Sequence, residues 1–281
     1  MVGVAALVGR LSRGHVVRVL ITGGAGLVAG HLVRTAPDGA EVHVTWRTAP
    51  PVDGPAAHRV DLCDGTAVRE LFGQVQPDLV VHTAYSQSSA ADVVDATAAV
   101  AGAAAACGAR LVHLSSDMVF GGSDAPYDED AVPDPLNDYG RWKLRAEQLA
   151  AEYVPSALVT RTSLVVSGDP LDHQARWLQR ALGAGETVTL FDDEYRTPVQ
   201  ATDLARTVWD LVADGASGVV HLAGPERLSR AQVGLRCAEQ LGLPTDLVRT
   251  ASAAEHPEPR PRDLSLASVR LANSVGGPVG W

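Results

Sequence analysis

The sequence predicts an α/β protein with a doubly wound parallel sheet and a smaller C-terminal α/β lobe. Two observations indicate this class. Short apolar runs ended by turn residues alternate with helical patterns from residue 16 onward, which is typical of βαβ units with right-handed crossovers. A glycine-rich turn also stands where the first strand meets the first helix. The alternation loosens after about residue 163, and this change indicates the second lobe.

The N-terminal half supplies the predicted sheet. Strands are expected at residues 16–22, 41–46, 58–62, 78–83, 110–115 and 157–162, and helices at 26–35, 64–74, 90–107 and 138–153. In the looser part, helices are expected at 172–182, 202–213 and 229–241, and a short strand at 219–222. We therefore divide the chain into an extension (1–14), a sheet domain (15–165) and a lobe (166–281) that is partly interleaved with that domain.

The composition excludes several classes of function. The 281 residues carry a net charge of −10, whereas a general nucleic-acid binder needs a surplus of Lys and Arg to neutralise phosphates. No apolar run reaches the roughly 20 residues that span a bilayer. Near the start, the arginines follow the apolar segment, which is the wrong order for a secretory signal. We expect neither nucleic acid nor membrane as a partner.

The cysteines give no structural framework. Cys63, Cys107 and Cys237 are far apart and show no CxxC spacing, so they predict no disulfide. Free thiols favour a reducing compartment. His, Asp and Glu show no metal-ligand spacing either. We therefore expect a cytoplasmic protein that binds no metal.

The glycine-rich turn predicts a phosphate-binding loop. Glycine allows positive φ and close backbone approach to a pyrophosphate, whose charge is met by free N–H groups at the helix N-terminus. The spacing Gly23-x-x-Gly26-x-x-Ala29 differs from the Gly-x-Gly-x-x-Gly of ordinary dehydrogenases, because Ala29 replaces the last glycine. We expect Gly23, Gly26, Leu27 and Val28 to bind a dinucleotide, which makes the sheet domain a Rossmann domain.

The ends of the second and third strands bear on the choice of cofactor. NAD enzymes tend to place an acid after the second strand, against the ribose 2′-OH, whereas this chain has Arg47 there. A guanidinium pairs with the 2′-phosphate of NADP, so NADP(H) is predicted and NAD(H) is the alternative. Asp61 and Leu62 are expected to contact the adenine, and a turn-capping role for Asp61 stays open.

Three further side chains predict the chemistry. Tyr139 and Lys143 lie on one face of the same helix, because a spacing of four residues is about one turn. A phenol has an ordinary pKa of about 10, and a nearby ammonium favours its ionised form. Tyr139 can then give a proton to a ketone oxygen as hydride reaches the carbon. Ser116 follows a strand at the carboxyl edge of the sheet, where its hydroxyl can bond the same oxygen.

With these residues the chain resembles the extended short-chain dehydrogenase/reductases, and within them the dTDP-4-dehydrorhamnose reductase family of nucleotide-sugar 4-ketoreductases. The resemblance covers residues 16 to about 205 and continues more loosely through 260–262 to the end of the chain. The matching stretches are GGAGLVA (23–29), VHTAY (81–85), LSSDMVF (114–120), PLNDYG (135–140) with Lys143, RTS (161–163) and DEYRTP (193–198).

The resemblance implies roles for individual residues of these stretches and for Arg262. Ser116, Tyr139 and Lys143 are its implied catalytic triad, with Lys143 also holding the nicotinamide ribose. The implied cofactor contacts are Tyr139 and Lys143 together with His82, Thr83, Ala84 and Thr162. The expected substrate contacts are Tyr85, Asp117, Arg196 and Arg262. Of these, the arginines suit the diphosphate of a nucleotide sugar, and a surface salt bridge is the alternative for each.

Three positions depart from related patterns. The family more often has Thr where Ser116 stands, but the hydroxyl is kept. Asn is common where His82 stands, and a packed histidine is the alternative to a cofactor contact. Met118 stands where nucleotide-sugar 4,6-dehydratases carry a Glu, and a thioether cannot exchange a proton, so dehydration is disfavoured.

The resemblance implies NADPH-dependent reduction of the 4-keto group of an NDP-4-keto-6-deoxyhexose, with the proton supplied by Tyr139. The implied partner is a small nucleotide-sugar substrate, and a homodimer is compatible with it. Three alternatives stay open: a nucleotide-sugar epimerase, a non-catalytic NADP-binding regulatory subunit, and a reductase of ketones that are not sugar-linked.

Overall fold

The computed structural model describes residues 16–51, 55–271 and 275–276. The extension expected at residues 1–14 lies outside this described part of the chain. By their contacts the residues fall into two compact units. Unit 1 comprises the described residues of 1–115 together with 138–160 and 205–220, and unit 2 comprises 116–137, 161–204 and the described residues of 221–281. The chain therefore passes between the units several times.

Seven strands form the main sheet, in the order β11-β6-β5-β4-β1-β2-β3. They are β1 (Val17–Thr22), β2 (Ala40–Trp46), β3 (Ala56–Arg59), β4 (Leu79–His82), β5 (Arg110–Leu114), β6 (Leu158–Thr162) and β11 (Gly218–Leu222). The pairs from β3 to β6 are all parallel, which confirms the predicted doubly wound sheet. The strand order reverses between β1 and β4, and ligands of such sheets bind at the carboxyl ends beside that reversal.

The helices of unit 1 begin and end at residues suited to those positions. They are α2 (Leu27–Arg34), α3 (Gly65–Val75), α4 (Ala90–Cys107), α5 (Asp138–Tyr153) and most of α7 (Ala201–Asp214). The Asp64 side chain accepts hydrogen bonds from the backbone of Thr66 and Ala67 and so caps α3. Ser89 caps α4 in the same way, and Gly108, with φ +72°, ends it.

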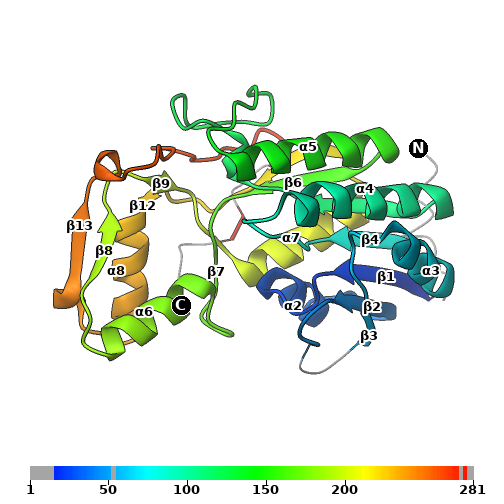
Figure 1. The fold of residues 1–281 in the computed structure, drawn as a ribbon, viewed down its shortest axis with the longest axis horizontal. Helices are drawn as coiled ribbons and strands as arrows, with labels where there is room; N and C mark the ends of the chain where they lie inside the picture. Colours follow the sequence, from blue (N-terminus) through cyan, green and yellow to red (C-terminus); the bar gives the residue numbers. More distant parts are fainter. Residues whose placement is uncertain (1–15, 52–54, 272–274, 277–281) are drawn as a thin grey trace. The chain divides into compact units, whose positions relative to one another are not determined.

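One face of the sheet carries a core built from small and branched side chains. It joins Leu20 and Val80 of the sheet to Val68 of α3, Val100 of α4 and Ala150 of α5. In Figure 1, α4 and α5 lie side by side along the sheet. Alanine dominates α4, so neighbouring helices and strands approach it closely.

Helix α4 is also the one helix in the described ranges that is long and apolar enough, by length and composition, to cross a membrane. It has 18 residues. Its apolar side chains Val93, Ala96 and Val100 are buried within unit 1. The same composition therefore serves the core of the sheet domain.

Unit 2 has small sheets and two packed helices. Its strands are β7 (Val165–Val166), β8 (Val188–Phe191), β9 (Tyr195–Arg196), β10 (Val199–Gln200), β12 (Leu228–Ser229) and β13 (Val248–Ala251), and its longer helices are α6 (His173–Gly183) and α8 (Arg230–Gln240). β8 pairs with β13, β7 with β10 and β9 with β12. Leu178 and Leu182 of α6 pack with Val188 of β8 and Cys237 of α8 into a separate core.

One predicted strand has different bounds in the structure, and several strands were not predicted. The third strand, expected at 58–62, runs over Ala56–Arg59 instead. Asp61 ends it, because its carboxylate accepts a hydrogen bond from the Cys63 backbone and its carbonyl accepts one from Asp64. None of the six short strands in the described part of unit 2 was predicted.

Candidate active site

The loop after β1 is as tight as its glycines suggest. Gly23 has φ +72°, and a Cβ added there would lie 3.0 Å from the Ala84 Cα. A Cβ on Gly24 would lie 2.7 Å from the Val44 Cβ. The Gly26 amide donates to the Gly23 carbonyl at 2.8 Å, which closes the turn just before α2. The loop therefore offers bare backbone at the N-terminus of a helix, where phosphate binds.

A cavity of about 350 Å³ opens beside this loop within unit 1. Eight residues predicted to contact cofactor or substrate line it: Gly23, Gly26, Arg47, Asp61, Leu62, Thr83, Ala84 and Tyr85. Leu27 and Val28 do not line it, but they form the first turn of α2. A cavity of this lining, bounded by the glycine loop and by the ends of β2 and β4, fits the adenosine and phosphate part of a dinucleotide.

The same cavity contains a carboxylate that the sequence analysis did not anticipate. Asp92, in the first turn of α4, lines the cavity and pairs with Arg47 through two hydrogen bonds of 2.6 and 2.9 Å. Asp61 lies 3.8 Å from the same guanidinium. The hydrogen bond to Asp92 raises the pKa of Arg47 and lowers that of Asp92. Arg47 thus occupies the position after β2 as the sequence showed, and α4 supplies an acid that pairs with it.

His82 is a packed histidine. Its Nδ1 lies 2.8 Å from the Thr22 hydroxyl and its Nε2 lies 3.1 Å from the Thr97 hydroxyl, and the ring is buried. Burial and the Lys143 charge lower its pKa to about 3, so the imidazole is neutral. Both ring nitrogens are bound inside unit 1, which favours the packed histidine over the cofactor contact as the role of the His82 side chain.

Lys143 is buried under the end of the sheet. Its Nζ donates to the Leu114 carbonyl at 2.5 Å, at the end of β5, and lies 5.8 Å from the Tyr85 ring centre. Burial lowers the Lys143 pKa to about 8, although Glu147 on the next turn opposes the change. Because the Lys143 pKa lies close to neutral pH, a bound ligand can change the protonation of this side chain more readily than that of an exposed lysine.

Tyr139 stands next to an aromatic residue that lines the cavity of unit 1. It occupies the first turn of α5, and its ring centre lies 6.1 Å from that of Tyr85, which lines the cavity. Tyr85 is 56% exposed, which is unusual for a large aromatic side chain. The structure thus brings Tyr139, Lys143 and Tyr85 together.

Two buried hydroxyls near the strand ends lack partners among the described residues. They are the Oγ of Ser115, directly after β5, and the Oγ1 of Thr162, the last residue of β6. Buried polar groups are normally hydrogen-bonded, so an unsatisfied hydroxyl at a strand end suits a polar ligand. Thr162 is among the predicted cofactor contacts and Ser115 is not.

Ser116 and Asp117 begin a 3-10 turn in unit 2. The Ser116 hydroxyl lies 3.1 Å from Asp117 Oδ1 and accepts a hydrogen bond from the Met118 amide at 3.2 Å. Asp117 is buried and its other oxygen accepts from the Ser163 hydroxyl at 2.9 Å. Burial raises the Asp117 pKa despite these bonds. Asp117 therefore orients the Ser116 turn.

Arg196 is held inside unit 2 by acidic side chains. Its guanidinium donates to Glu194 at 3.0 Å and its Nε lies 3.4 Å from Asp117 Oδ2. Glu194 also accepts from Arg260 at 2.7 Å. The Arg196 side chain is only 5% exposed, so its contacts are those of a buried ion pair. The predicted role of Arg196 in substrate binding gains no support from these contacts.

The other arginines differ in their partners. Arg262 is exposed and pairs with Asp193 at 2.7 Å. Arg230, the first residue of α8, has Glu194, Arg196, Arg260 and Asp117 as its charged neighbours. Within the described part of the chain, its guanidinium makes no hydrogen bond and no ion pair shorter than 4 Å. The sequence did not predict a role for Arg230, because a lone arginine at a helix start carries no motif.

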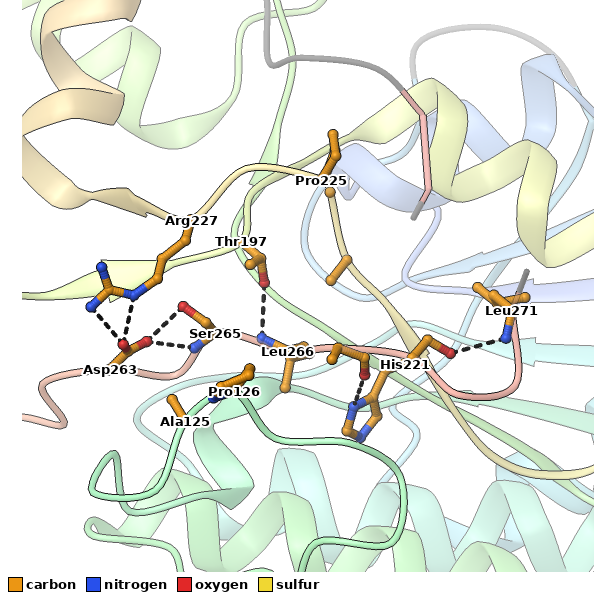
Figure 2. A pocket seen from close by; sticks show the side chains of 14 residues that line it. Ala125, Pro126, Thr197, His221, Pro225, Arg227, Asp263, Ser265, Leu266 and Leu271 are labelled. Atoms are coloured by element: carbon orange, nitrogen blue, oxygen red, sulfur yellow. Dashed lines mark hydrogen bonds and ion pairs between the residues drawn. The ribbon is translucent and has the colours of Figure 1, made fainter. Parts of the chain in front are cut away.

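A second cavity, of about 600 Å³, lies within unit 2 (Figure 2). Arg227 and Asp263 form an ion pair of 2.7 Å in its wall, and Ser265 donates to the same carboxylate. Thr197 lines the cavity too, and its amide donates to the Ser163 hydroxyl that bonds Asp117. Hydrogen bonds therefore connect this wall to the Ser116 turn.

The parallel sheet, the glycine loop after β1 and the Tyr139–Lys143 pair on α5 together define an extended short-chain dehydrogenase/reductase. A family profile described as the RmlD substrate binding domain matches residues 17–279. The chain belongs to this family.

Several relatives are named reductases. A probable low-salt glycan biosynthesis reductase of Haloferax volcanii is 33% identical over 275 residues, or 91% of each chain. A dTDP-4-dehydrorhamnose reductase of Mycolicibacterium smegmatis is 32% identical, over 93% of this chain and 81% of its own. Another relative is not named a reductase: the methionine adenosyltransferase 2 subunit beta of Rattus norvegicus is 30% identical, over 83% of this chain and 74% of its own.

Solved structures agree on the fold. A hypothetical dTDP-4-dehydrorhamnose reductase from Sulfolobus tokodaii superimposes with a TM-score of 0.78 at 26% identity, covering 89% of this chain and 91% of its own. A dTDP-4-dehydrorhamnose reductase from Bacillus anthracis, in complex with NADP, gives 0.79 at 20% identity, covering 90% of each. At that identity the second likeness concerns the fold alone.

Proposed function

We propose that this protein is an NADPH-dependent reductase that converts the 4-keto group of a nucleotide-linked 4-keto-6-deoxyhexose into an alcohol. Membership of the family, the reductases among the relatives and the glycine-loop cavity support this reaction class. Ser116, Tyr139 and Lys143 are the proposed catalytic residues.

The observation that carries the proposal is the state of Lys143. It is the only lysine in the sequence, in which all the other residues of the Lys and Arg type are arginines. Arginine supplies surface charge equally well, but its pKa is too high for it to lose a proton. A buried lysine with a pKa of about 8, one turn from Tyr139, suits a role that requires a tunable ammonium.

The proposed reduction needs the cofactor and three side chains. Bound NADPH supplies the hydride to the carbonyl carbon, and NADP⁺ is the other product. Tyr139 donates the phenolic proton to the carbonyl oxygen, and the Lys143 ammonium stabilises the resulting phenolate. The Ser116 hydroxyl, turned from Asp117 toward the substrate, donates a second hydrogen bond to the same oxygen. The tyrosine regains its proton from solvent after the alcohol has formed.

Unit 2 is proposed to bind the substrate. Arg196 and Arg260 pair with Asp117 and Glu194, whereas the Arg230 guanidinium makes no ion pair shorter than 4 Å among the described residues. This third guanidinium favours a substrate anion close to the Ser116 turn. We infer that Arg230 binds the diphosphate of the nucleotide sugar, while Arg196 keeps the turn in place. Arg262 remains a predicted contact at the surface.

The remaining expectations follow from this assignment. NADP(H) is the proposed cofactor, held by Gly23, Gly26 and Arg47 and by the first turn of α2. The residues 166–281 are the proposed substrate lobe. We infer a cytoplasmic enzyme whose partner is its small-molecule substrate and not a membrane, and a homodimer is compatible with this function.

The test uses purified protein, NADPH and a panel of nucleotide-linked 4-keto-6-deoxyhexoses, with the absorbance of reduced nicotinamide as readout. One of them should be reduced with equal consumption of NADPH. Tyr139→Phe should lower kcat by about a hundredfold or more. Tyr153→Phe, on the exposed end of the same helix, is the matched control and should leave kcat unchanged. Isomerisation without net NADPH consumption would instead indicate an epimerase, and tight NADPH binding without turnover a regulatory subunit.

A further inference from the structure

The pairing of Arg47 with Asp92 affects how the cavity of unit 1 can receive a cofactor. Asp92 binds both terminal nitrogens of Arg47, and Asp61 lies 3.8 Å from one of them. The Arg47 side chain is 51% exposed and that of Asp92 only 17%. One guanidinium and two carboxylates therefore meet in the part of the cavity that follows β2.

The two nicotinamide cofactors differ at the ribose 2′ position, which the end of β2 recognises in such folds. NADPH carries a phosphate there, with a charge of about −1.5 to −2 at neutral pH as for other phosphate monoesters. NADH carries a hydroxyl that donates a hydrogen bond to a carboxylate. Arg47 attracts the phosphate, whereas Asp92 and Asp61 repel it and can accept a hydrogen bond from the hydroxyl.

We propose that Asp92 competes with the 2′-phosphate of the cofactor for Arg47 and so narrows the preference of the protein for NADPH over NADH. The inference rests on the proposed dinucleotide-dependent activity. Without Asp92, the Arg47 guanidinium would be free to bind the phosphate through two parallel hydrogen bonds.

Asp92 is the fixed partner of the pair. It stands in the first turn of α4, where the Ser89 hydroxyl caps its amide at 3.1 Å. The Cys63 thiol also donates to its Oδ1, at 3.6 Å. Arg47 stands in the irregular segment after β2 on a long side chain. When a phosphate enters, Arg47 therefore has to turn away from a carboxylate that stays in place.

The other charged neighbours do not remove this competition. Arg59 donates to the Arg47 carbonyl at 3.4 Å, and its guanidinium lies over the Trp46 ring, 5.5 Å from the ring centre. Asp61 adds negative charge instead of offsetting that of Asp92. The mutual effects of Arg47 and Asp92 on their pKa values keep both charged at neutral pH.

The experiment compares the full chain with Asp92→Asn, Asp92→Ser and a matched control, Asp95→Asn. Asp95 lies on the same helix, is exposed and does not line the cavity, so its substitution removes the same charge elsewhere. Circular dichroism checks that each variant is folded. Dissociation constants for NADPH and NADH come from the fluorescence of the bound reduced nicotinamide, and adenosine 2′,5′-bisphosphate competition isolates the phosphate end of the ligand.

In Asp92→Asn, NADPH and adenosine 2′,5′-bisphosphate should bind about tenfold more tightly, because the repulsion is removed and Arg47 is released. NADH should bind equally well or more weakly. Asp92→Ser should do the same, and Asp95→Asn should match the wild type. Arg47→Met should weaken NADPH binding and leave NADH binding within about twofold.

Two results would overturn the inference. They differ in whether the proposed reductase function fails together with it. If the ratio of the NADPH and NADH constants in both folded Asp92 variants stays within twofold of the Asp95→Asn ratio, Asp92 has no part in cofactor choice, but the proposed reductase function stands. If the wild type binds neither dinucleotide, the proposed function fails as well.

Discussion

Replacing Lys143 by methionine should make the protein more stable and almost inactive. The methionine keeps an unbranched chain in the buried site and removes the charge. The difference between the ordinary lysine value of 10.5 and the folded pKa of about 8 means that burial of the ammonium costs about 3 kcal/mol, at about 1.4 kcal/mol per pH unit. The lost hydrogen bond to the Leu114 carbonyl offsets about 1–2 kcal/mol of that gain.

The expected net effect at pH 7 is a gain of about 1–2 kcal/mol in the free energy of unfolding, with kcat lowered by about a hundredfold or more. The stability gain should depend on pH in a defined direction. The folded pKa of Lys143 is depressed, so the unfolded chain binds the proton more tightly, and wild-type stability rises with pH between about 8 and 10.5. The advantage of the variant should therefore shrink by about 2 kcal/mol between pH 7 and pH 10.

Urea unfolding followed by circular dichroism at both pH values measures these differences, and other titrating groups cancel between wild type and variant. Lys143→Arg is the control that keeps a charge but cannot lose a proton, and it should be less stable than the methionine variant and equally inactive. A Lys143→Met variant less stable than the wild type by more than about 1 kcal/mol, or a stability difference that does not change with pH, would contradict a buried ammonium with a depressed pKa.

Three further predictions concern the loop and the arginines. Gly23→Ala should lower the free energy of unfolding by about 1–2 kcal/mol, because φ is +72° and the new Cβ meets Ala84, and it should weaken NADPH binding as measured by titration. Arg230→Ala should raise KM for the nucleotide sugar about tenfold with little change in kcat, and an unchanged KM would place the diphosphate elsewhere. Arg196→Met should destabilise the fold by about 3 kcal/mol in urea unfolding, because Asp117 and Glu194 lose a buried partner. The exposed Arg262→Met should cost less than about 1 kcal/mol, and equal costs for the two would contradict the structural role of Arg196.

The sheet was predictable because its signal is repeated along the chain. Most of the parallel strands are short, mainly apolar runs between turn residues, and every helix of unit 1 stands close to its predicted position. The exception is β3 (Ala56–Arg59), which is mostly exposed and was misplaced. The two-residue strands of unit 2 have no period to read, since their pairing depends on segments distant in sequence, such as β9 with β12.

The candidate site was predictable where a motif carries it. The residues of the glycine loop and the end of β2 line one cavity, and Tyr139 and Lys143 share a helix face near Tyr85. Asp92 was missed because its partner Arg47 is 45 residues away and the pairing arises only when α4 packs on the sheet. The burial of Arg196 was likewise invisible, since it depends on Asp117 and Glu194 as neighbours.

Nuclear magnetic resonance of lysine-labelled protein tests the central claim most directly, because one side-chain resonance reports on Lys143 alone. Titration without ligand should give a pKa near 8, and NADPH should shift the resonance. A lysine that titrates near its ordinary pKa of 10.5, with a resonance that NADPH does not shift, would contradict the proposed role of Lys143.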